Sequence, residues 1–408
     1  MHRAGAGVLS QLLQFSPPSE RTLPCPCGHH ARYKELRSKT LLTVVGAAEL
    51  KRPYYHCEHC GAGQFPIDQE LDVSQVETSP GVRRMMAVVG SESPFDQGRQ
   101  HLELLADLKV TTKAVERHAE QIGADIAARE HVEIQRAQQL QLPIPIGPSI
   151  PKLYIQMDAT GVPVVAKETV GRSGKTEGQP AHTRDVKLGC VYTQTKLDEQ
   201  GRPVRDQAST TYTGAIETAA EFGCRIYLEA FRRGWARAAI KVVIGDGAVW
   251  IWNLAQEYFP GAILIVDLYH AREHLHETSK LLFPQDPAAR RCWMTQPQAL
   301  LDNGQIEPLV QALRSLIPTH PEVADRLRTE ANYFEHNAER MRYPEFRSRG
   351  LFVGSGVIEA GCKTVIGARL KNSGMFWTVN GANDIIALRC TLFSGTFEDY
   401  WETRALAG

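Results

Sequence analysis

The sequence lacks three features that would place it in a broad class of proteins at once. No stretch approaches the roughly 18 consecutive apolar residues of a membrane-spanning helix, so we expect no membrane association. Residues 1–14 lack the charged start and long apolar stretch of an export signal. The 46 lysines and arginines equal the 46 aspartates and glutamates, so net charge does not mark a nucleic-acid binder. We therefore expect a cytoplasmic protein.

Positive charge is nevertheless concentrated in two segments. Residues 21–60 contain seven lysines and arginines against three acidic residues. Residues 361–378 contain Lys363, Arg369 and Lys371 and no acidic residue. Because phosphates respond to charges within about 10 Å, such local patches matter more than the total charge. These three basic residues are therefore candidates for contacts with phosphates.

Cysteine is present in an odd number, nine, which fits a reducing compartment and one metal site better than a disulfide scaffold. Two close pairs, Cys25 with Cys27 and Cys57 with Cys60, match the usual delivery of four ligands to a structural zinc ion. The β-like residues between the pairs predict a zinc ribbon. Because the first pair is unusually tight, a histidine could replace one cysteine. The candidates are His29, His30, His56 and His59.

The pattern along the chain divides it into regions. We predict a tail over 1–20, a zinc ribbon over 21–75 and a helical region over 76–141. Four prolines in residues 142–151 exclude a regular helix or a central strand there, so this stretch is the expected linker. Beyond it, residues 152–408 alternate strand and helix patterns and form a predicted α/β domain, with a helical insertion over about 275–350.

Part of the helical region resembles a helix-turn-helix. Thr111 or Thr112 can cap a helix that we expect to end near Gly123, with a further helix to about Leu140. Its predicted inner face consists of Val115, Ala119 and Ile122. Polar residues recur every fourth position on another face, where they could contact DNA. They are Lys113, Arg117 and Gln121.

Two acidic residues follow apolar, strand-like runs. Asp158 ends the run 153–158, and Asp246 ends the run 242–246. Acids at the carboxyl ends of neighbouring buried strands share the crevice where ligands bind in α/β sheets, and a divalent cation would relieve their repulsion. The alternative is that both acids cap turns or helices.

A third acid, Glu359, lies near the start of a predicted helix that follows Gly354-Ser355-Gly356. Lys363 is one helical turn further along, on the same expected face. The simplest alternative is a surface ion pair between the two residues.

Another short motif, His270-Ala271-Arg272-Glu273-His274, matches the inverted zinc-peptidase pattern H-x-x-E-H. On a helix the two histidines would share a face with Glu273 nearby. A five-residue match is a weak signal, and this hypothesis leaves the cysteine pairs unexplained. The alternative is a polar helix face.

The ordered acids Asp158, Asp246 and Glu359 resemble the catalytic set of DDE transposases, whose core is ribonuclease H-like. Further motifs resemble bacterial insertion-sequence transposases of the Kra type. They are Cys-Pro-Cys-Gly at 25–28, Tyr-Tyr-His-Cys-Glu-His-Cys-Gly at 54–61, Asp-Gly at 246–247, Gly-Ser-Gly-Val-Ile-Glu at 354–359, Lys-Asn-Ser-Gly-Met-Phe-Trp at 371–377 and Asp-Tyr-Trp at 399–401.

The resemblance implies a ribonuclease H-like mixed sheet with a helical insertion, preceded by a zinc ribbon and a helix-turn-helix region. It implies that Asp158, Asp246 and Glu359 bind two Mg²⁺ ions, with Asp267 and His270 as supporting residues of an Asp-x-x-His element. The chain would then cut and join double-stranded DNA, as a homo-oligomer on element ends at the nucleoid. Rival hypotheses are a catalytically inactive DNA-binding regulator and the zinc peptidase.

Overall fold

The computed structural model describes residues 2–143, 145–174, 179–317 and 321–406, and it contains two compact units. The first unit comprises Met1–Ala127 with Thr396–Gly408, and the second comprises Ala128–Gly395. Residue 144 of the expected linker, residues 175–178 and 407–408 of the expected catalytic domain and residues 318–320 of the expected insertion lie outside the described residues. The division into a linker and functional domains stays a prediction, because compactness alone does not test it.

The first unit begins with a four-stranded antiparallel sheet. Its strands are β1 (Thr22–Pro24), β2 (His30–Thr43), β3 (Gly46–His56) and β4 (Gly63–Gln64). The turn between β2 and β3 falls at Val44 and Val45, and the two strands supply the β structure expected between the cysteine pairs.

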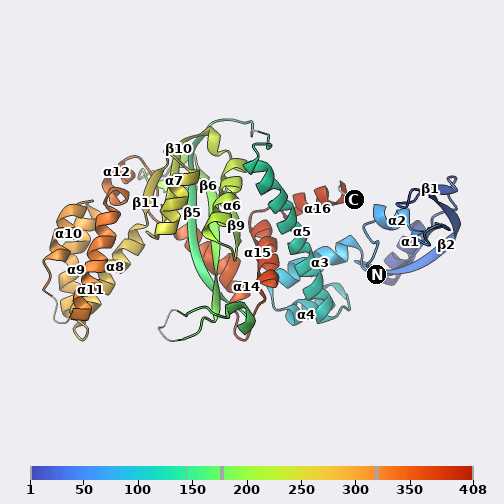
Figure 1. Ribbon diagram of the computed structural model, residues 1–408, viewed down its shortest axis with the longest axis horizontal. Coiled ribbons are helices and arrows are strands. Elements are labelled where there is room, and N and C mark those ends of the chain that lie inside the picture. Colours follow the sequence, from blue (N-terminus) through green and yellow to red (C-terminus); the bar gives the residue numbers. More distant parts are fainter. Residues whose placement is uncertain (1, 144, 175–178, 318–320, 407–408) are drawn as a thin grey trace. The chain divides into compact units, whose positions relative to one another are not determined.

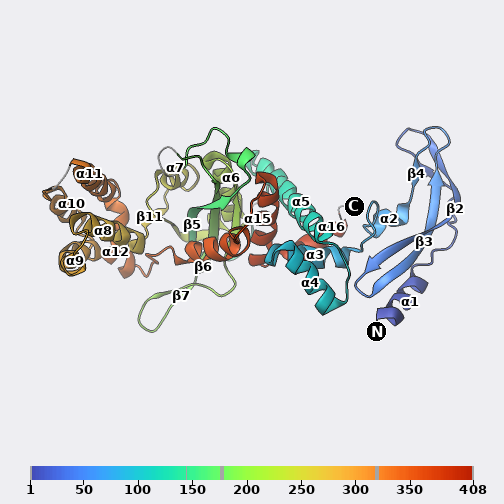
Figure 2. The same ribbon diagram turned by 90° about the horizontal axis from the view of Figure 1, so that it is seen from below.

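The segment expected as a tail contains helix α1 (His2–Leu12), which packs against β3 (Figure 2). The Phe15 amide donates to the Lys51 carbonyl at 2.9 Å, and the Lys51 amide donates to the Leu13 carbonyl at 3.0 Å. The side chains of Leu13 and Phe15 pack on the buried residues Leu41, Leu50 and Val73. Apolar burial therefore orders this segment, whose sequence shows no strong strand or turn signal.

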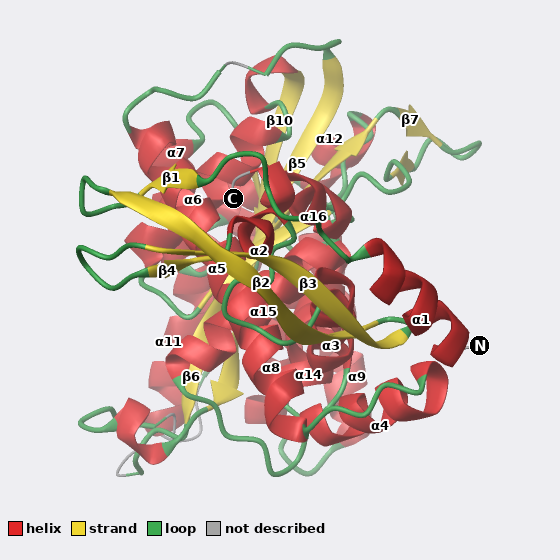
Figure 3. Cartoon of the chain, turned by 90° about the vertical axis from the view of Figure 1, so that its right-hand side faces the viewer, coloured by secondary structure: helices red, strands yellow, loops and turns green. Residues whose placement is uncertain are grey.

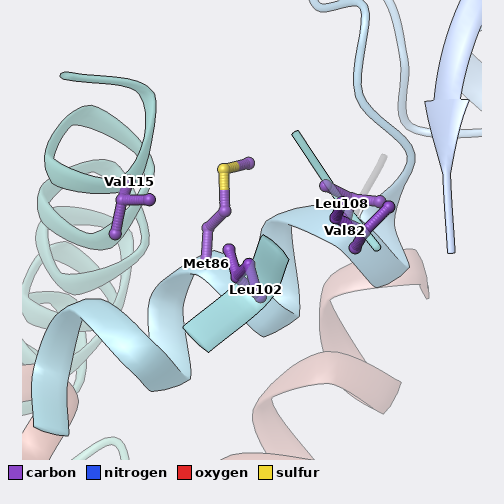
Figure 4. Close-up of a cluster of buried hydrophobic side chains, with 5 residues drawn as sticks. All are labelled: Val82, Met86, Leu102, Leu108 and Val115. Carbon is purple, nitrogen blue, oxygen red and sulfur yellow. The ribbon is translucent and has the colours of Figure 1, made fainter. Parts of the chain in front are cut away.

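The helical part of the first unit includes α2 (Pro66–Glu70), α3 (Pro80–Glu92), α4 (Phe95–Ala106), the start of α5 (Thr112–Gln138) and α16 (Phe397–Leu406). Buried side chains of the segments that hold α3, α4 and α5 form one cluster (Figure 4). It consists of Val82, Met86, Leu102, Leu108 and Val115. The Arg404 guanidinium on α16 lies 3.1 Å from the Asp72 carboxylate, within the same unit.

Helix α5 corrects one expectation, because it continues through Gly123 to Gln138 instead of ending there. A glycine inside a helix costs only about 1 kcal/mol relative to alanine, and Gly123 is buried. The inner face is confirmed, since Val115, Ala119 and Ile122 are buried. The helix-turn-helix interpretation of α4 and α5 stays a prediction.

The second unit contains a mixed five-stranded sheet, which confirms the α/β class (Figure 3). In sheet order the strands are β11 (Ile263–Val266), β10 (Ala238–Gly245), β5 (Ile150–Pro163), β6 (Thr183–Gln194) and β9 (Thr211–Ala215). β11, β10 and β5 are parallel, and β6 is antiparallel to both of its neighbours. A small hairpin of β7 (Lys196–Leu197) and β8 (Pro203–Val204) lies apart.

Helices cover both faces of this sheet (Figure 1). A side chain at Gly189 of β6 would meet Phe222 and Ile226 of α6 (Ala219–Arg232), beside which lies α7 (Val249–Tyr258). Leu188 instead lies near Gly361 of α13 (Gly356–Gly361). Because successive residues of a strand point to opposite faces, α6 and α13 lie on opposite sides of the sheet.

The described residues between β11 and α13 are mainly helical, and the interpretation of about 275–350 as an insertion stays a prediction. These residues form α8 (Leu268–Leu282), α9 (Pro287–Asp302), α10 (Ile306–Arg314), α11 (Pro321–His336) and α12 (Tyr343–Ser348). After α13 the chain makes a π-helical turn at Cys362–Gly367 and continues through α14 (Ala368–Leu370) and α15 (Val379–Phe393). No described helix is long and apolar enough to span a bilayer.

Candidate functional site

The register of the parallel pair β5 and β10 aligns two of the predicted acids. Their pairing ends at Gln156 opposite Ile244, and Asp158 and Asp246 each lie two residues beyond this pair. Asp158 does not end its strand, because β5 continues to Pro163 while paired with β6. The expectation that Asp158 is strand-terminal is therefore wrong, but the acid does lie at the carboxyl end of the β5–β10 ladder.

Glu359 of α13 lines the same pocket as these two acids. The pocket has a volume of about 260 Å³. It is lined by Met157, Asp158, Asp246, Tyr269, His270, Glu273, Ser355, Ile358 and Glu359. The Ser355 hydroxyl donates to Glu359 Oε1 at 2.9 Å. All three acids singled out in the sequence thus meet at one cavity.

Gln156, which the sequence patterns did not mark, holds the loop before α13 and the first turn of that helix, which carries Glu359. Its side chain is fully buried. Its Nε2 donates to the Gly354 carbonyl at 3.1 Å, and its Oε1 accepts from the Ile358 amide at 3.0 Å. The available signal was a polar residue inside the apolar run 153–157, two positions before Asp158.

Asp267, which directly follows β11, holds the same loop. It is fully buried at the start of α8, where its Oδ1 accepts from the His270 amide at 2.8 Å. Its Oδ2 accepts from the Ser355 amide. Asp267 is therefore placed to position the loop, and His270 lines the pocket with its Nδ1 3.4 Å from Glu273 Oε2.

The pocket concentrates negative charge without a compensating cation. Among the described residues, no lysine, arginine or histidine forms an ion pair with Asp158, Asp246 or Glu359. Burial raises the pKa of the Asp158 carboxyl, and the charges of Asp246 and Glu359 raise it further. The fully ionised site is therefore unfavourable by itself and would be relieved by a bound cation.

The donor atoms indicate which cation fits. Three carboxylates are hard oxygen ligands of the kind that Mg²⁺ takes together with water or phosphate oxygens. Their oxygens do not all lie within 4.8 Å of one another in the described residues, so they do not form a closed cage for one ion. Two ions roughly 3.5–4 Å apart would span a wider set of ligands.

Cys362, in the π-helical turn after α13, lies beside this site. Its Sγ is 3.4 Å from Asp158 Oδ2. Burial and the neighbouring Asp158 charge raise the pKa of the Cys362 thiol, so the protonated thiol donates to the carboxylate. Cys362 therefore contributes a weak hydrogen bond here instead of a thiolate that would favour a soft metal.

The motif His270-x-x-Glu273-His274 does lie on one helix, α8, but its second histidine is engaged elsewhere. His274 Nδ1 lies 2.7 Å from Glu330 Oε2, and its ring stacks on Tyr333 with centroids 3.8 Å apart. Among the described residues, no third ligand completes a metal-binding cluster with these side chains. This arrangement favours a structural role for His274.

The four predicted zinc ligands converge in the first unit. Cys25 Sγ lies 3.5 Å from Cys60 Sγ, and Cys27 Sγ lies 3.7 Å from Cys57 Sγ. All four sulfur atoms are within 4.8 Å of one another. Tetrahedral zinc with Zn–S bonds of about 2.3 Å requires sulfur atoms about 3.8 Å apart, so the cluster fits a zinc ion.

Two glycine turns shape this cluster. The Gly28 amide donates to the Cys25 carbonyl and the Gly61 amide to the Cys57 carbonyl, both at 2.9 Å. Both glycines have positive φ, 83° and 73°, which a residue with a side chain rarely adopts. The tight first pair is thus compatible with four cysteine ligands. The backbone amides of Cys60 and His59 lower the pKa of the Cys57 thiol to about 6 and favour the thiolate.

Of the histidines considered as substitutes, only two lie close to the cysteines. His29 and His59 stack with centroids 3.6 Å apart and form a second three-residue group with Cys27. His30 and His56 belong to neither group among the described residues. The four-cysteine set has the better geometry, and His29 and His59 lie beside it.

The predicted DNA-contacting residues differ in accessibility. Lys113, Arg117 and Gln121 are exposed on α5, and Lys363 is exposed after α13. Glu359 and Lys363 form no ion pair in the described residues. Lys371 is also exposed and donates to the Thr160 hydroxyl.

Arg369 does not match its expectation as a phosphate contact. Its side chain is fully buried, and its guanidinium lies 4.9 Å from the centroid of the Trp377 ring. A buried side chain of this kind stabilises the segment after α13 and cannot reach a phosphate at the surface. Arg369 therefore drops out of the set of candidate DNA contacts.

Comparisons with known proteins give little further information. No family model and no curated protein matches the chain. One similar solved structure is a Drosophila P element transposase strand transfer complex, which matches with 10% sequence identity over 79% of this chain and 80% of that chain. The TM-score is 0.26, which is too low to argue from.

The cysteine cluster generates a prediction about zinc. The purified full-length chain should contain about one zinc ion, because a closed four-ligand site holds one ion. Cys57→Ser should lose the zinc and destabilise the first unit, whereas the matched variant Cys292→Ser, at an exposed cysteine, should keep it. Elemental analysis with thermal unfolding measures both. Full zinc content in Cys57→Ser would remove that residue from the site.

The role of Gln156 generates a second prediction. Gln156→Leu should weaken Mn²⁺ binding at the acid pocket by roughly 10–100-fold, the usual cost of removing a residue that orients metal ligands. Mn²⁺ serves as a spectroscopic probe of the site, and its binding is measured by electron paramagnetic resonance.

The matched control is Gln194→Leu. Gln194 is equally buried, and its Nε2 donates to the Gly350 carbonyl at 3.0 Å. Both variants should lose about 1–3 kcal/mol of unfolding free energy through unsatisfied buried groups. Only Gln156→Leu should lose Mn²⁺ affinity, and equal losses in both variants would mean that Gln156 has a purely structural role.

Proposed function

We propose that the chain is a DNA transposase that cuts the ends of a mobile element and joins them to target DNA. The observation that carries this proposal is the meeting of Asp158, Asp246 and Glu359 at one pocket without a cationic partner. The acids come from segments far apart in the sequence, and they are the three that the transposase resemblance implies.

The catalytic core in this proposal is ribonuclease H-like. Its support is the mixed five-stranded sheet with β5 at its centre and acids at the carboxyl end of the β5–β10 ladder. The helices α8 to α12 between Asp246 and Glu359 agree with the helical insertion that the resemblance implies.

Asp158, Asp246 and Glu359 would hold two Mg²⁺ ions, which would supply charge neutralisation and activation of the attacking oxygen when bound. Gln156 and Asp267 keep the loop before Glu359 in place, so the third carboxylate faces the other two. Exposed Lys363 and Lys371 would bind phosphates that flank the reacting one.

The proposed reaction has two steps, a phosphodiester hydrolysis and a transesterification. In the first, a water oxygen forms a bond to phosphorus while the bond to the 3′ oxygen of the element end breaks, which leaves a free 3′ hydroxyl. In the second, this hydroxyl attacks a phosphorus atom of target DNA, and the 3′ oxygen of the target strand leaves. Neither step requires a covalent bond between DNA and the chain.

Recognition of the terminal repeats would belong to the zinc ribbon and to α4 and α5. The exposed face of α5 with Lys113, Arg117 and Gln121 is the proposed DNA-reading surface. A homo-oligomer would pair two element ends on double-stranded DNA at the nucleoid.

A second candidate function is a DNA-binding regulator that retains this architecture without cutting. The observation that favours it is that the carboxylate oxygens do not all lie within 4.8 Å of one another, so the three acids do not form a closed site for one ion. An assay of metal-dependent nicking on the cognate element ends separates the two functions, since only a transposase cuts. It also separates the transposase from a peptidase that uses His270, Glu273 and His274.

Removing any one of the three acids should abolish cutting. Asp158→Asn, Asp246→Asn and Glu359→Gln keep the side-chain shape and remove a charge that faces the metal ions. We expect more than a 100-fold loss of strand cleavage, because residues that merely orient metal ligands already cost about 10–100-fold. Gel assays on labelled element ends measure the rates.

End binding should survive in these variants, and Mg²⁺ should raise the thermal midpoint of the wild-type chain but not of the variants. Glu257→Gln, at an exposed acid of α7, is the matched control and should cut normally. Substantial cutting by any of the three variants would exclude that residue from the site.

Lys363 should contact a phosphate near the scissile bond. Lys363→Ala is then expected to lower the cleavage rate and to reduce the salt dependence of DNA binding by roughly one unit of slope. Lys280→Ala removes an exposed lysine that pairs with Glu277 and should change neither quantity. An unchanged rate together with an unchanged slope would leave Lys363 as an ordinary surface residue.

A further inference from the structure

One large aromatic side chain at the acid pocket is left open to solvent. Tyr269, at the start of α8, lines the pocket together with the three acids, and 61% of its surface is exposed. Its ring therefore presents a flat apolar surface next to the acid pocket. Neither core packing nor the proposed handling of metal ions accounts for that exposure.

The ring is held in place although it is exposed. The Arg272 guanidinium lies 5.7 Å from the ring centroid. It is held by two hydrogen bonds to the Asp302 carboxylate, from Nε at 3.1 Å and from Nη2 at 2.7 Å. The ring also lies against Gly354, where an added Cβ would come within 3.1 Å of Tyr269 Cε2. The Tyr269 ring is thus restricted by Arg272 and by the backbone at Gly354, while much of the ring stays exposed to solvent.

We infer that Tyr269 is a stacking platform for one unpaired nucleobase of the DNA whose phosphate enters the acid pocket. This inference rests on the proposed function and adds to it a subsite for a base. Every base has a π-face, so stacking on an aromatic ring is favourable and tolerant of sequence. Stacking offsets part of the free-energy cost of unpairing a base next to the reacting phosphate.

The test measures binding without cutting, with Ca²⁺ in place of Mg²⁺. The probe is a fluorescent synthetic duplex that ends in a short unpaired 3′ overhang, compared with the same duplex whose overhang carries abasic nucleotides. The wild-type chain should bind the overhang with bases roughly ten-fold more tightly than the abasic one. Tyr269→Leu should bind both equally, and Tyr269→Trp should keep the preference.

The matched control is Phe376→Leu, which removes an equally exposed ring, 65% exposed, that lines a different cavity. It should keep the preference for bases. No preference in the wild-type chain, or an intact preference in Tyr269→Leu, would overturn the platform. Either result leaves the metal-dependent cutting of element ends standing, so failure of the platform and failure of the proposed function are distinguishable.

Discussion

The parallel pairing of β5 with β10 is the constraint on which the candidate site depends. Asp158 and Asp246 are 88 positions apart in the chain, yet each lies two residues beyond the last pair of the ladder, Gln156 with Ile244. Any slip of one residue between these strands would turn one of the acids to the opposite face. The side chains of Leu153, Tyr154 and Ile155 on β5 and of Val242, Val243 and Ile244 on β10 are fully buried, and this burial holds the register.

Electrostatic repulsion between the three acids makes this arrangement unfavourable by itself. Three carboxylates meet without a cation, and burial raises the pKa of Asp158. The surrounding structure keeps them together through neutral contacts, since the Gln156 amide and the Ser355 hydroxyl hold the loop and Glu359 without neutralising the charge. Charge left uncompensated inside an otherwise well-bonded scaffold is characteristic of a binding site for a cation.

The two candidate metal sites differ in how far apart their ligands lie in the sequence. The cysteine cluster joins two turns at the base of one β-hairpin, and each turn is shaped by a glycine with positive φ. The acid pocket collects residues from β5, the end of β10 and α13, with a bundle of helices inserted before the third acid. The cysteine cluster is therefore easier to predict from sequence motifs than the acid pocket, because its ligands and turns are close together in the sequence.

The amino-acid sequence by itself determined the α/β class, the strand pattern of the core and the cysteine pairs, because apolar periodicity and ligand spacing are local properties. It also singled out Asp158, Asp246 and Glu359, which the structure brings to one pocket. It did not reveal helix α1 with the packing of Leu13 and Phe15, the unbroken helix through Gly123 or the burial of Arg369. Each of these depends on contacts with residues distant in the chain. The same holds for the hydrogen bonds from Gln156 to Gly354 and Ile358. Only tertiary packing decides which polar side chains are buried and which of them face a cavity.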